Sequence, residues 1–399
     1  MEPTIQERAA ALGMIEKMTE IQRGALDSGK MSVLDATIHE INQILFPGTK
    51  MEEVYAFDAQ RDGETEFKHA FVTWKACVEN ALVKVSHMKN KVEADFEFLM
   101  CYLEHAGFEE IEQLLKDNLE AQKAKDTQVY ELLIKIYQRY QGFWGTLDPE
   151  RGVYDCVIQR ARALKEHVEE WRWLFGELCD TRSKKALYNV LVNWITFEPS
   201  FLQSSKEMIY KDYFDFDLIP ETTEDEVFVD LGGYIGDTVE EFVNAYSANY
   251  KRIYTYEINP HNLKCLRETV DGYSDVVVRE NAVGEQAGTL YLDMRIGGSS
   301  TTLAQNGEQA VAVVSLDEDI TERITWIKMD IEGSEQSALK GCKRHIEMEK
   351  PKLTICTYHN NEDIWKIPKM VKEYNPEYKL YFRYNGRSIH PSEYVLFAL

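Results

Sequence analysis

The sequence has no long hydrophobic run and no paired cysteine motif. No apolar stretch approaches the roughly 20 residues that a membrane-spanning helix requires, and the opening segment MEPTIQE has neither a basic region nor an apolar core. We therefore expect no membrane span and no secretory signal. The seven cysteines are odd in number, widely scattered and without a C-x-x-C pair, which is typical of reduced thiols in a cytoplasmic protein.

Positive charge is also scarce. The 399 residues carry 45 Lys and Arg against 68 Asp and Glu, a net charge of −23 at pH 7. Such a chain repels the phosphate backbone of nucleic acids and an anionic membrane surface, so we expect neither as the main partner. The length is sufficient for two domains, each with its own core.

The first half of the chain has a helical hydrophobic period. Apolar residues recur at steps of three and four in Phe67–Val85, Val129–Tyr140 and Val157–Leu178, as on one face of an amphipathic helix. The last stripe also follows the a and d positions of a coiled coil. We expect an all-α domain over residues 1–205. A bundle core explains its stripes, and a homo-oligomer seam or partner groove is the alternative.

Beyond Pro220 short β-branched runs alternate with helical stretches, which is typical of a doubly wound α/β sheet. We expect a second domain over residues 206–399, with strands near Val227, Ile253, Val276, Trp326 and Leu353. Helices are expected over residues 237–246, 260–270, 334–345 and 361–374. Two alternating runs, residues 378–383 and 393–398, predict a hairpin at the sheet edge.

The most specific stretch is the segment EVFVDLGGYIGDT, residues 226–238. A short strand ends in Asp230 and runs into a glycine-rich turn, which lets a ligand approach the N-terminus of the following helix. Leu231 occupies the first glycine position of a dinucleotide motif, and Asp230 would repel dinucleotide phosphates. An acid here suits S-adenosylmethionine, which presents an ammonium, a sulfonium and sugar hydroxyls.

Three further motifs follow in order. The second strand ends at Glu257, roughly twenty residues beyond the loop, where an acid binds ribose hydroxyls. Because Asn259 and Pro260 follow, this segment is also a good helix start. The third strand leads into the turn Asn281-Ala-Val-Gly284, and the fourth runs through the segment IKMDIEGSE, residues 327–335.

Together these motifs resemble the FkbM family of S-adenosylmethionine-dependent methyltransferases, over roughly Tyr213–Leu399. Two positions depart from the family pattern: Gly233, where Ala is frequent, and Tyr234, which is often Asn. The resemblance implies a Rossmann-like class I methyltransferase sheet, here preceded by the helical domain. It also implies S-adenosyl-L-methionine as cofactor and O-methylation of a hydroxyl on a small-molecule or glycan acceptor.

The expected cofactor residues all belong to these motifs. They are Asp230, Gly232, Gly233, Tyr234, Gly236, Asp237, Thr238, Glu257, Ile258, Asn259, Asn281, Ala282, Val283 and Asp330.

Methyl transfer to a hydroxyl requires a group that takes the acceptor's proton. His359, after the fifth strand, is the leading candidate, since histidine titrates near neutral pH and the family resemblance includes a histidine there. Asp330 is the second candidate, as base or by orienting the hydroxyl, and Lys328 alternates with it on one strand face. Complementing a helix dipole would fully explain Glu335 and explains Asp330 less well.

Two alternatives stay open. Although we predict no metal site, Asp330 and Glu332 could join His359 around a divalent metal that lowers the pKa of the hydroxyl. Alternatively, the second half only binds the cofactor, and the helical half is an interaction module.

Overall fold

The computed structural model describes residues 91–399 apart from 209–211, 294–301, 305–308 and 387–388. The predicted Phe67–Val85 stripe lies outside these residues. Within them, no helix has both the length and the apolar character needed to cross a membrane.

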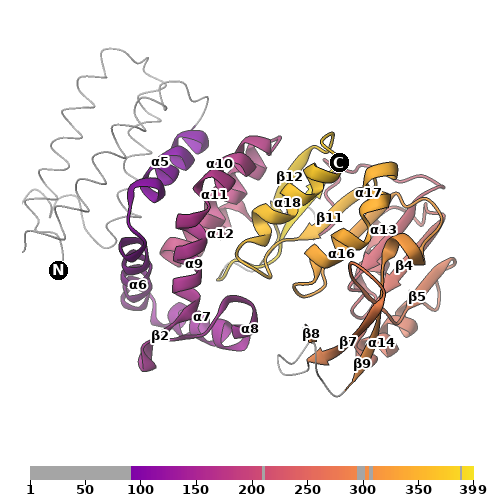
Figure 1. Cartoon of the computed structure of the whole chain (residues 1–399), viewed down its shortest axis with the longest axis horizontal. Helices are drawn as coiled ribbons and strands as arrows, with labels where there is room; N and C mark the ends of the chain where they lie inside the picture. Colours follow the sequence, from indigo (N-terminus) through magenta and orange to yellow (C-terminus); the bar gives the residue numbers. More distant parts are fainter. Residues whose placement is uncertain (1–90, 209–211, 294–301, 305–308, 387–388) are drawn as a thin grey trace, which may run out of the picture.

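Helices gather at the N-terminal side of the described chain (Figure 1). They are α5 (Lys91–His105), α6 (Phe108–Lys125), α7 (Thr127–Arg139), α8 (Gln141–Trp144), α9 (Asp155–Glu166), α10 (Val168–Glu177), α11 (Thr181–Thr196) and α12 (Pro199–Ser205). A short antiparallel pair, β1 (Leu147–Asp148) and β2 (Val153–Tyr154), interrupts them. Asp126 begins α7 and Asp180 begins α11, because each side chain accepts a hydrogen bond from backbone N–H groups of the first turn.

The Val157–Leu178 stripe lies inside this helical region. Val157, Leu164 and Trp171 are fully buried, and the chain breaks at His167 between α9 and α10, so the stripe is not one continuous coiled-coil helix. The face predicted from Val129–Tyr140 is correct only in part: Val129, Ile136 and Tyr140 pack against the core, but the most buried side chains are others. Tyr130, Leu133 and Tyr137 are buried on α7, whereas Leu132 is 42% exposed.

The large sheet has the strand order β12-β13-β11-β10-β3-β4-β5. Its strands are β3 (Val227–Leu231), β4 (Arg252–Tyr256), β5 (Val276–Arg279), β10 (Trp326–Met329), β11 (Lys352–Cys356), β12 (Leu380–Tyr384) and β13 (Tyr394–Ala398). The first five are parallel, and β13 is antiparallel to both β11 and β12. The expected doubly wound sheet and its terminal hairpin are both present, with β13 lying inside the sheet and β12 at its edge.

The connecting helices are α13 (Asp237–Ala245), α14 (Pro260–Val270), α15 (Leu316–Asp319), α16 (Glu335–Gly341), α17 (Lys343–Glu349) and α18 (Asp363–Tyr374). They match the predictions apart from α15, which we did not predict, and the pair α16 and α17. The single helix expected over residues 334–345 is wrong, because Cys342 separates α16 from α17. In the core, Phe228 of β3 stacks on Phe242 of α13 with ring centroids 4.4 Å apart.

A second sheet, which we did not predict, follows β5. Its order is β6-β9-β7-β8, formed by β6 (Ala282–Val283), β9 (Ala310–Val314), β7 (Gly288–Asp293) and β8 (Thr302–Ala304). Because β6 comes directly after Asn281, this sheet begins at one of the predicted cofactor motifs.

The helical region packs on the β12 edge of the large sheet. Ser183 of α11 accepts a hydrogen bond from the Phe382 backbone N–H at 2.9 Å, and the Arg383 guanidinium pairs with Asp180 and Asp215 at 2.7 Å each. Figure 1 shows β12 between the helices and the rest of the sheet. One continuous hydrophobic cluster spans both regions.

Candidate active site

A cavity of about 360 Å³ lies where β3, β4 and β10 end. Its wall contains Leu231 and Tyr256, the last residues of β3 and β4, and Asp330, which follows β10. Open α/β sheets bind ligands in the crevice outside the carboxyl ends of their strands. The cavity is therefore the expected place for a cofactor and an acceptor.

The glycine-rich turn adopts a conformation that only glycine accepts easily. Gly232 and Gly236 have φ of 86° and 89°. A side-chain carbon at Gly232 would lie 1.9 Å from the Asp330 carbonyl oxygen, and one at Gly233 would lie 2.1 Å from Thr255 Oγ1. Thr255 thus explains why this chain has Gly at position 233.

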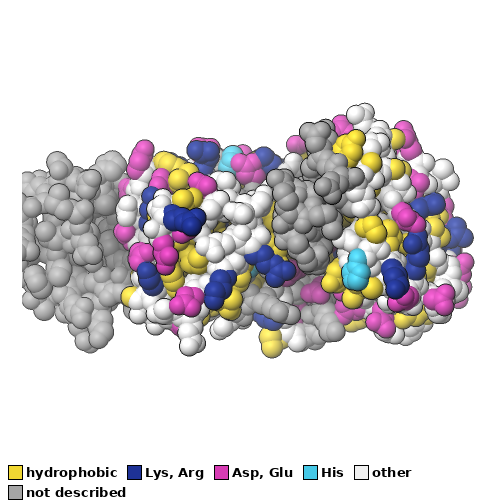
Figure 2. All heavy atoms as spheres, turned by 90° about the horizontal axis from the view of Figure 1, so that it is seen from below, with side chains coloured by type: hydrophobic (Ala, Val, Ile, Leu, Met, Phe, Trp, Pro, Cys, Tyr) yellow, Lys and Arg dark blue, Asp and Glu magenta, His cyan; other side chains and the backbone are white. Residues whose placement is uncertain are grey.

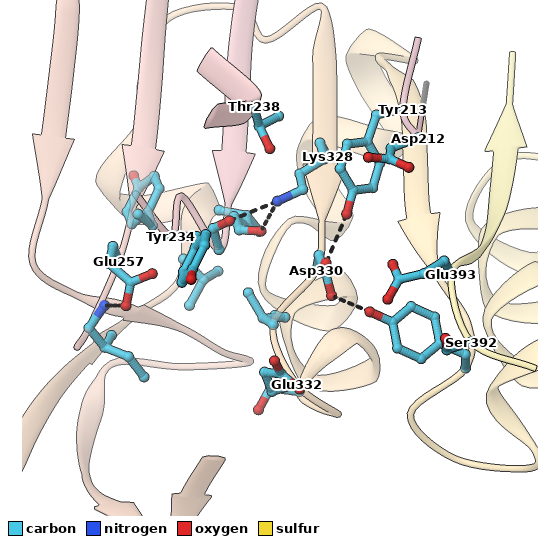
Figure 3. Close-up of a pocket in the computed structure, with 18 of the residues that line it drawn as sticks. Asp212, Tyr213, Tyr234, Thr238, Glu257, Lys328, Asp330, Glu332, Ser392 and Glu393 are labelled. Carbon is cyan, nitrogen blue, oxygen red and sulfur yellow. Dashed lines mark hydrogen bonds between the residues drawn. The ribbon is translucent and has the colours of Figure 1, made fainter. Parts of the chain in front are cut away.

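A buried ion pair lies beneath this turn. Lys328 Nζ is 2.9 Å from Asp230 Oδ1. Lys328 also donates to the Gly232 carbonyl oxygen at 2.8 Å (Figure 3). Asp230 is fully buried, and burial raises the pKa of its carboxyl although Lys328 opposes the change. Asp230 is not part of the cavity wall. Asp230 therefore does not face a ligand. It pairs with the Lys328 ammonium, which in turn donates to the backbone of the turn.

Glu257 faces the cavity at the end of β4. Its Oε1 accepts hydrogen bonds from the backbone N–H groups of Ile258 at 2.8 Å and Asn259 at 2.6 Å. Burial raises the pKa of the carboxyl, and these amides work against the rise. Asn259 instead caps α14 by accepting from the His261 backbone N–H at 2.9 Å. The segment therefore starts a helix through Asn259 and also presents the Glu257 carboxylate to the cavity.

Most of the predicted cofactor residues meet at this end of the cavity, which we call the cofactor end. Those that line it are Gly232, Tyr234, Asp237, Thr238, Glu257, Ile258, Asn281, Ala282 and Val283. Three others, Gly233, Gly236 and Asn259, join Asp230 outside the wall. Figure 3 shows Glu257 and Tyr234 on the side of Asp330 opposite Glu393.

Asp330 lies at the centre of the cavity. Tyr213 donates a hydrogen bond to its Oδ2 at 2.8 Å, and Tyr358 donates to its Oδ1 at 3.3 Å (Figure 3). Burial alone would raise the pKa of the Asp330 carboxyl, but His359, Lys328 and the two tyrosine hydroxyls together lower it. Asp330 is therefore a carboxylate at neutral pH.

His359 lies behind Asp330 and is not part of the cavity wall. It is 1% exposed, and the Phe143 ring lies 5.3 Å from its ring. Its Nδ1 is 3.0 Å from Glu335 Oε1, and its Nε2 is 3.3 Å from Glu332 and 3.6 Å from Asp330. Burial would lower the pKa of His359, but Glu335 and Glu332 raise it well above its usual value. The ring is therefore an imidazolium.

Asp330, Glu335 and His359 also have potential metal-ligating atoms within 4.8 Å of one another. Glu332, which the metal-dependent alternative placed in such a group, is not among them. Asp330 lies against Nε2 of the imidazole and Glu335 lies against Nδ1. A metal ion bound to one nitrogen of the His359 ring could bind both carboxylates only if the one at the other nitrogen moved around the ring. The arrangement therefore fits a proton on each nitrogen better than a metal.

The opposite end of the cavity, which we call the acceptor end, contains residues that the sequence did not reveal. They are Tyr140, Phe143, Trp144, Asp212, Tyr213, Tyr358, His390, Ser392 and Glu393. Trp144 is fixed by a hydrogen bond from its Nε1 to the Tyr358 carbonyl oxygen at 2.8 Å. No sequence motif connected these residues to the distant cofactor motifs.

Four of the nine described non-glycine residues with a positive φ line the cavity. Asp212, Tyr234, Glu332 and Glu393 line it, and each has a positive φ between 38° and 58°. Non-glycine residues adopt this conformation at a cost, and they persist in it mostly at functional sites. These four residues are consistent with a ligand-binding role for the cavity.

Comparisons with known proteins agree with this geometry. Residues 230–388 match the family model described as the methyltransferase FkbM domain. The structure of methyltransferase FkbM from Methylobacillus flagellatus KT is similar with a TM-score of 0.54 and 24% identity, over 68% of this chain and 71% of that chain. The expected class I methyltransferase fold with preceding helices is thereby confirmed.

A more distant likeness is to a precorrin-6y C5,15-methyltransferase from Geobacter metallireducens GS-15. It has a TM-score of 0.29 and 14% identity, over 45% of this chain and 81% of that chain, and this score is too low to support an inference. A search of the curated proteins found no significant match.

Proposed function

Residues 230–388 belong to the FkbM methyltransferase domain family, and on this premise we propose that the protein is an S-adenosyl-L-methionine-dependent O-methyltransferase. The proposed acceptor is a hydroxyl of a sugar, glycan or small metabolite. The observation that carries the proposal is the single cavity, which joins the carboxylate of Glu257 at one end to that of Asp330 at its centre.

The residues at the cofactor end suit S-adenosyl-L-methionine. Glu257, held rigidly by two backbone amides, offers a carboxylate to ribose hydroxyls. Asn281, Ala282 and Val283 offer a polar and an apolar surface beside it, which suits the adenine base. The cofactor supplies a methyl group activated by the sulfonium.

Asp330 is the residue that we assign to the chemistry. Its carboxylate is held by Tyr213 and Tyr358, so it can orient an acceptor hydroxyl toward the cofactor end. An oxygen that gains a methyl group becomes strongly acidic, and a carboxylate of low pKa can then take the proton. His359 is already protonated and lies behind Phe143. We therefore assign it to positioning Asp330.

A nucleic-acid acceptor has less support. The net charge of −23 opposes it, and on the face seen in Figure 2 the described Lys and Arg side chains are interspersed with Asp and Glu. A small-molecule or glycan acceptor fits an enclosed cavity better.

Calorimetry and product analysis test the proposal. The purified protein should bind S-adenosyl-L-methionine and its demethylated product and should not bind NAD. Incubation with methyl-labelled cofactor and cell extract should transfer the label to a small molecule or glycan, with or without a chelator. Tight binding of NAD without binding of S-adenosyl-L-methionine would refute the proposal, and binding without transfer to any acceptor would favour the interaction module.

A further inference from the structure

The acceptor end of the cavity is rich in carboxylates. Asp212 and Glu393 line it, and Asp330 and Glu332 lie in the wall of the same cavity. Lys328 is the one lysine or arginine among the described lining residues, and its ammonium is paired with Asp230. Behind the wall, the His359 imidazolium faces three carboxylates, those of Asp330, Glu332 and Glu335. The cationic groups described near this end, Lys328 and His359, are therefore already paired with carboxylates other than Glu393.

Glu393 is the carboxylate that most needs a partner. No described residue forms an ion pair with it. Burial and the nearby Asp330 and Asp212 raise the pKa of its carboxyl to about 8. In Figure 3 the Glu393 side chain extends toward Asp330. A positive charge bound here would let Glu393 ionise at neutral pH.

Aromatic rings form the adjoining wall. Phe143 and Trp144 of α8 line the cavity, and the Trp144 ring lies 4.6 Å from that of His390, three residues before Glu393. Ring faces attract cations, and ammonium ligands are recognised by combining them with carboxylates. The wall that adjoins Glu393 therefore also favours a cation.

His390 indicates that the ligand is polar as well. Its side chain lines the cavity, is 8% exposed, and has no hydrogen bond at Nε2 within the described part of the chain. Burial and Arg160 lower the pKa of His390 to about 3, so the imidazole is neutral and does not repel a cation. A buried polar atom without a partner at a cavity wall is costly unless a ligand or water satisfies it.

We propose that the acceptor carries a positively charged ammonium group in addition to its hydroxyl, and that Glu393 and the aromatic rings of α8 bind this group at the acceptor end. The inference rests on the proposed function for the position of the hydroxyl at Asp330. Phosphorylated and carboxylated acceptors are excluded by the same charge.

Choline and its uncharged isostere 3,3-dimethyl-1-butanol test the inference, because they share size and hydroxyl and differ in charge alone. Each is titrated by calorimetry into the full-length protein saturated with S-adenosylhomocysteine. Choline should bind at least tenfold more tightly than the alcohol. Glu393→Gln should remove this preference, whereas Glu240→Gln, which removes an exposed carboxylate outside the cavity, should keep it.

A pH series on the unaltered protein provides a second measurement that requires no variant. Choline has the same charge at every pH, so its affinity should rise as Glu393 ionises through about pH 8. The groups that face Glu393 are Asp330, Asp212, His359, Glu332, Tyr213, Cys356, Tyr358 and Tyr384. Of these, Asp330 has a lowered pKa and the tyrosines and the cysteine have raised pKa values, so Glu393 should change its charge between pH 7 and 9. The pKa of His359 is also raised, and loss of its proton makes the site more negative, so it acts in the same direction as Glu393.

The outcomes separate the two proposals. If S-adenosylhomocysteine binds but choline binds no better than the alcohol, the ammonium subsite is refuted and the proposed function stands. If choline affinity does not rise with pH, Glu393 does not bind the ammonium group, and the proposed subsite at Glu393 is refuted. If S-adenosylhomocysteine itself does not bind, the proposed function is refuted.

Discussion

The two ends of the cavity are built in different ways. At the cofactor end, Glu257 is held by the amides one and two residues further along the chain. At the acceptor end, Tyr213 bonds to Asp330 across 117 residues, and Trp144 bonds to Tyr358 across 214. A site held by neighbours in sequence can be recognised from sequence. A site assembled from distant segments requires the fold, and it can change its ligand without disturbing the other end.

Of the changes considered, removal of the helical region should have the largest effect, because it should abolish the function of the acceptor end and leave the cofactor end intact. A truncated protein beginning near Lys206 lacks Phe143 and Trp144, yet it keeps every predicted cofactor residue. We expect it to bind S-adenosylhomocysteine within a few-fold of the full chain and to have no measurable activity on the natural acceptor. Calorimetry and a methyl-transfer assay measure the two properties.

The same truncation tests whether residues 1–205 and 206–399 are separate domains. Because the β12 edge loses its cover of α11, the fragment should melt at a lower temperature than the full chain. Methylation of the natural acceptor at the full-length rate would show that the helical region has no part in the acceptor end. A fragment that cannot fold would show that the shared core makes the two regions one unit.

Asp330→Asn should be the most damaging single substitution. It keeps the size of the side chain and removes the charge that orients and deprotonates the hydroxyl, so we expect the rate to fall by roughly 100- to 10,000-fold. Affinity for S-adenosylhomocysteine should change little. Tyr213→Phe is the matched control, since it removes one hydrogen bond to Asp330 and should cost much less. Full activity in the Asp330→Asn variant would remove Asp330 from the mechanism.

Glu257→Ala acts at the other end. Losing hydrogen bonds from ribose hydroxyls to a charged acceptor costs at least about 1.4 kcal/mol, or tenfold in affinity. Calorimetry with S-adenosylhomocysteine should show this loss, and Glu240→Gln on neighbouring α13 should bind normally. Unchanged affinity in the Glu257→Ala variant would place the ribose elsewhere.

His359→Gln should have a smaller effect on rate than Asp330→Asn, because His359 acts by holding Asp330. The pKa of His359 is raised above 6.5. Its contribution to stability is therefore complete below about pH 6.5 and is lost as pH rises through the higher pKa of the folded state. Thermal melting from pH 6 to 10 should show this loss in the unaltered protein and a flatter profile in the variant.

The pH profile of activity decides between the two roles of His359. If His359 is the base, activity must increase as the ring loses its proton. If it positions Asp330, activity should decline over the same range. An increase at high pH that disappears in His359→Gln would restore His359 as the base.

The sequence by itself determined the cofactor end and the parallel sheet. Strand ends, glycine turns and helix starts such as Asn259-Pro260 depend on neighbouring residues, so their patterns survive without the fold. Even there, tertiary structure changed the role of Asp230. The sequence could not show that β10 lies beside β3. This pairing places Lys328 opposite Asp230, so Asp230 forms a buried ion pair instead of the predicted ligand contact.

Tertiary structure alone decided the acceptor end. His359 does follow the fifth strand, as predicted, but Phe143 covers it and three carboxylates keep it protonated. Glu393 reaches the cavity because β13, besides forming the predicted hairpin with β12, also pairs with β11, and no local pattern encodes this second pairing. Accessibility and charge state depend on every group within a few ångströms in space, and those groups come from segments far apart along the chain.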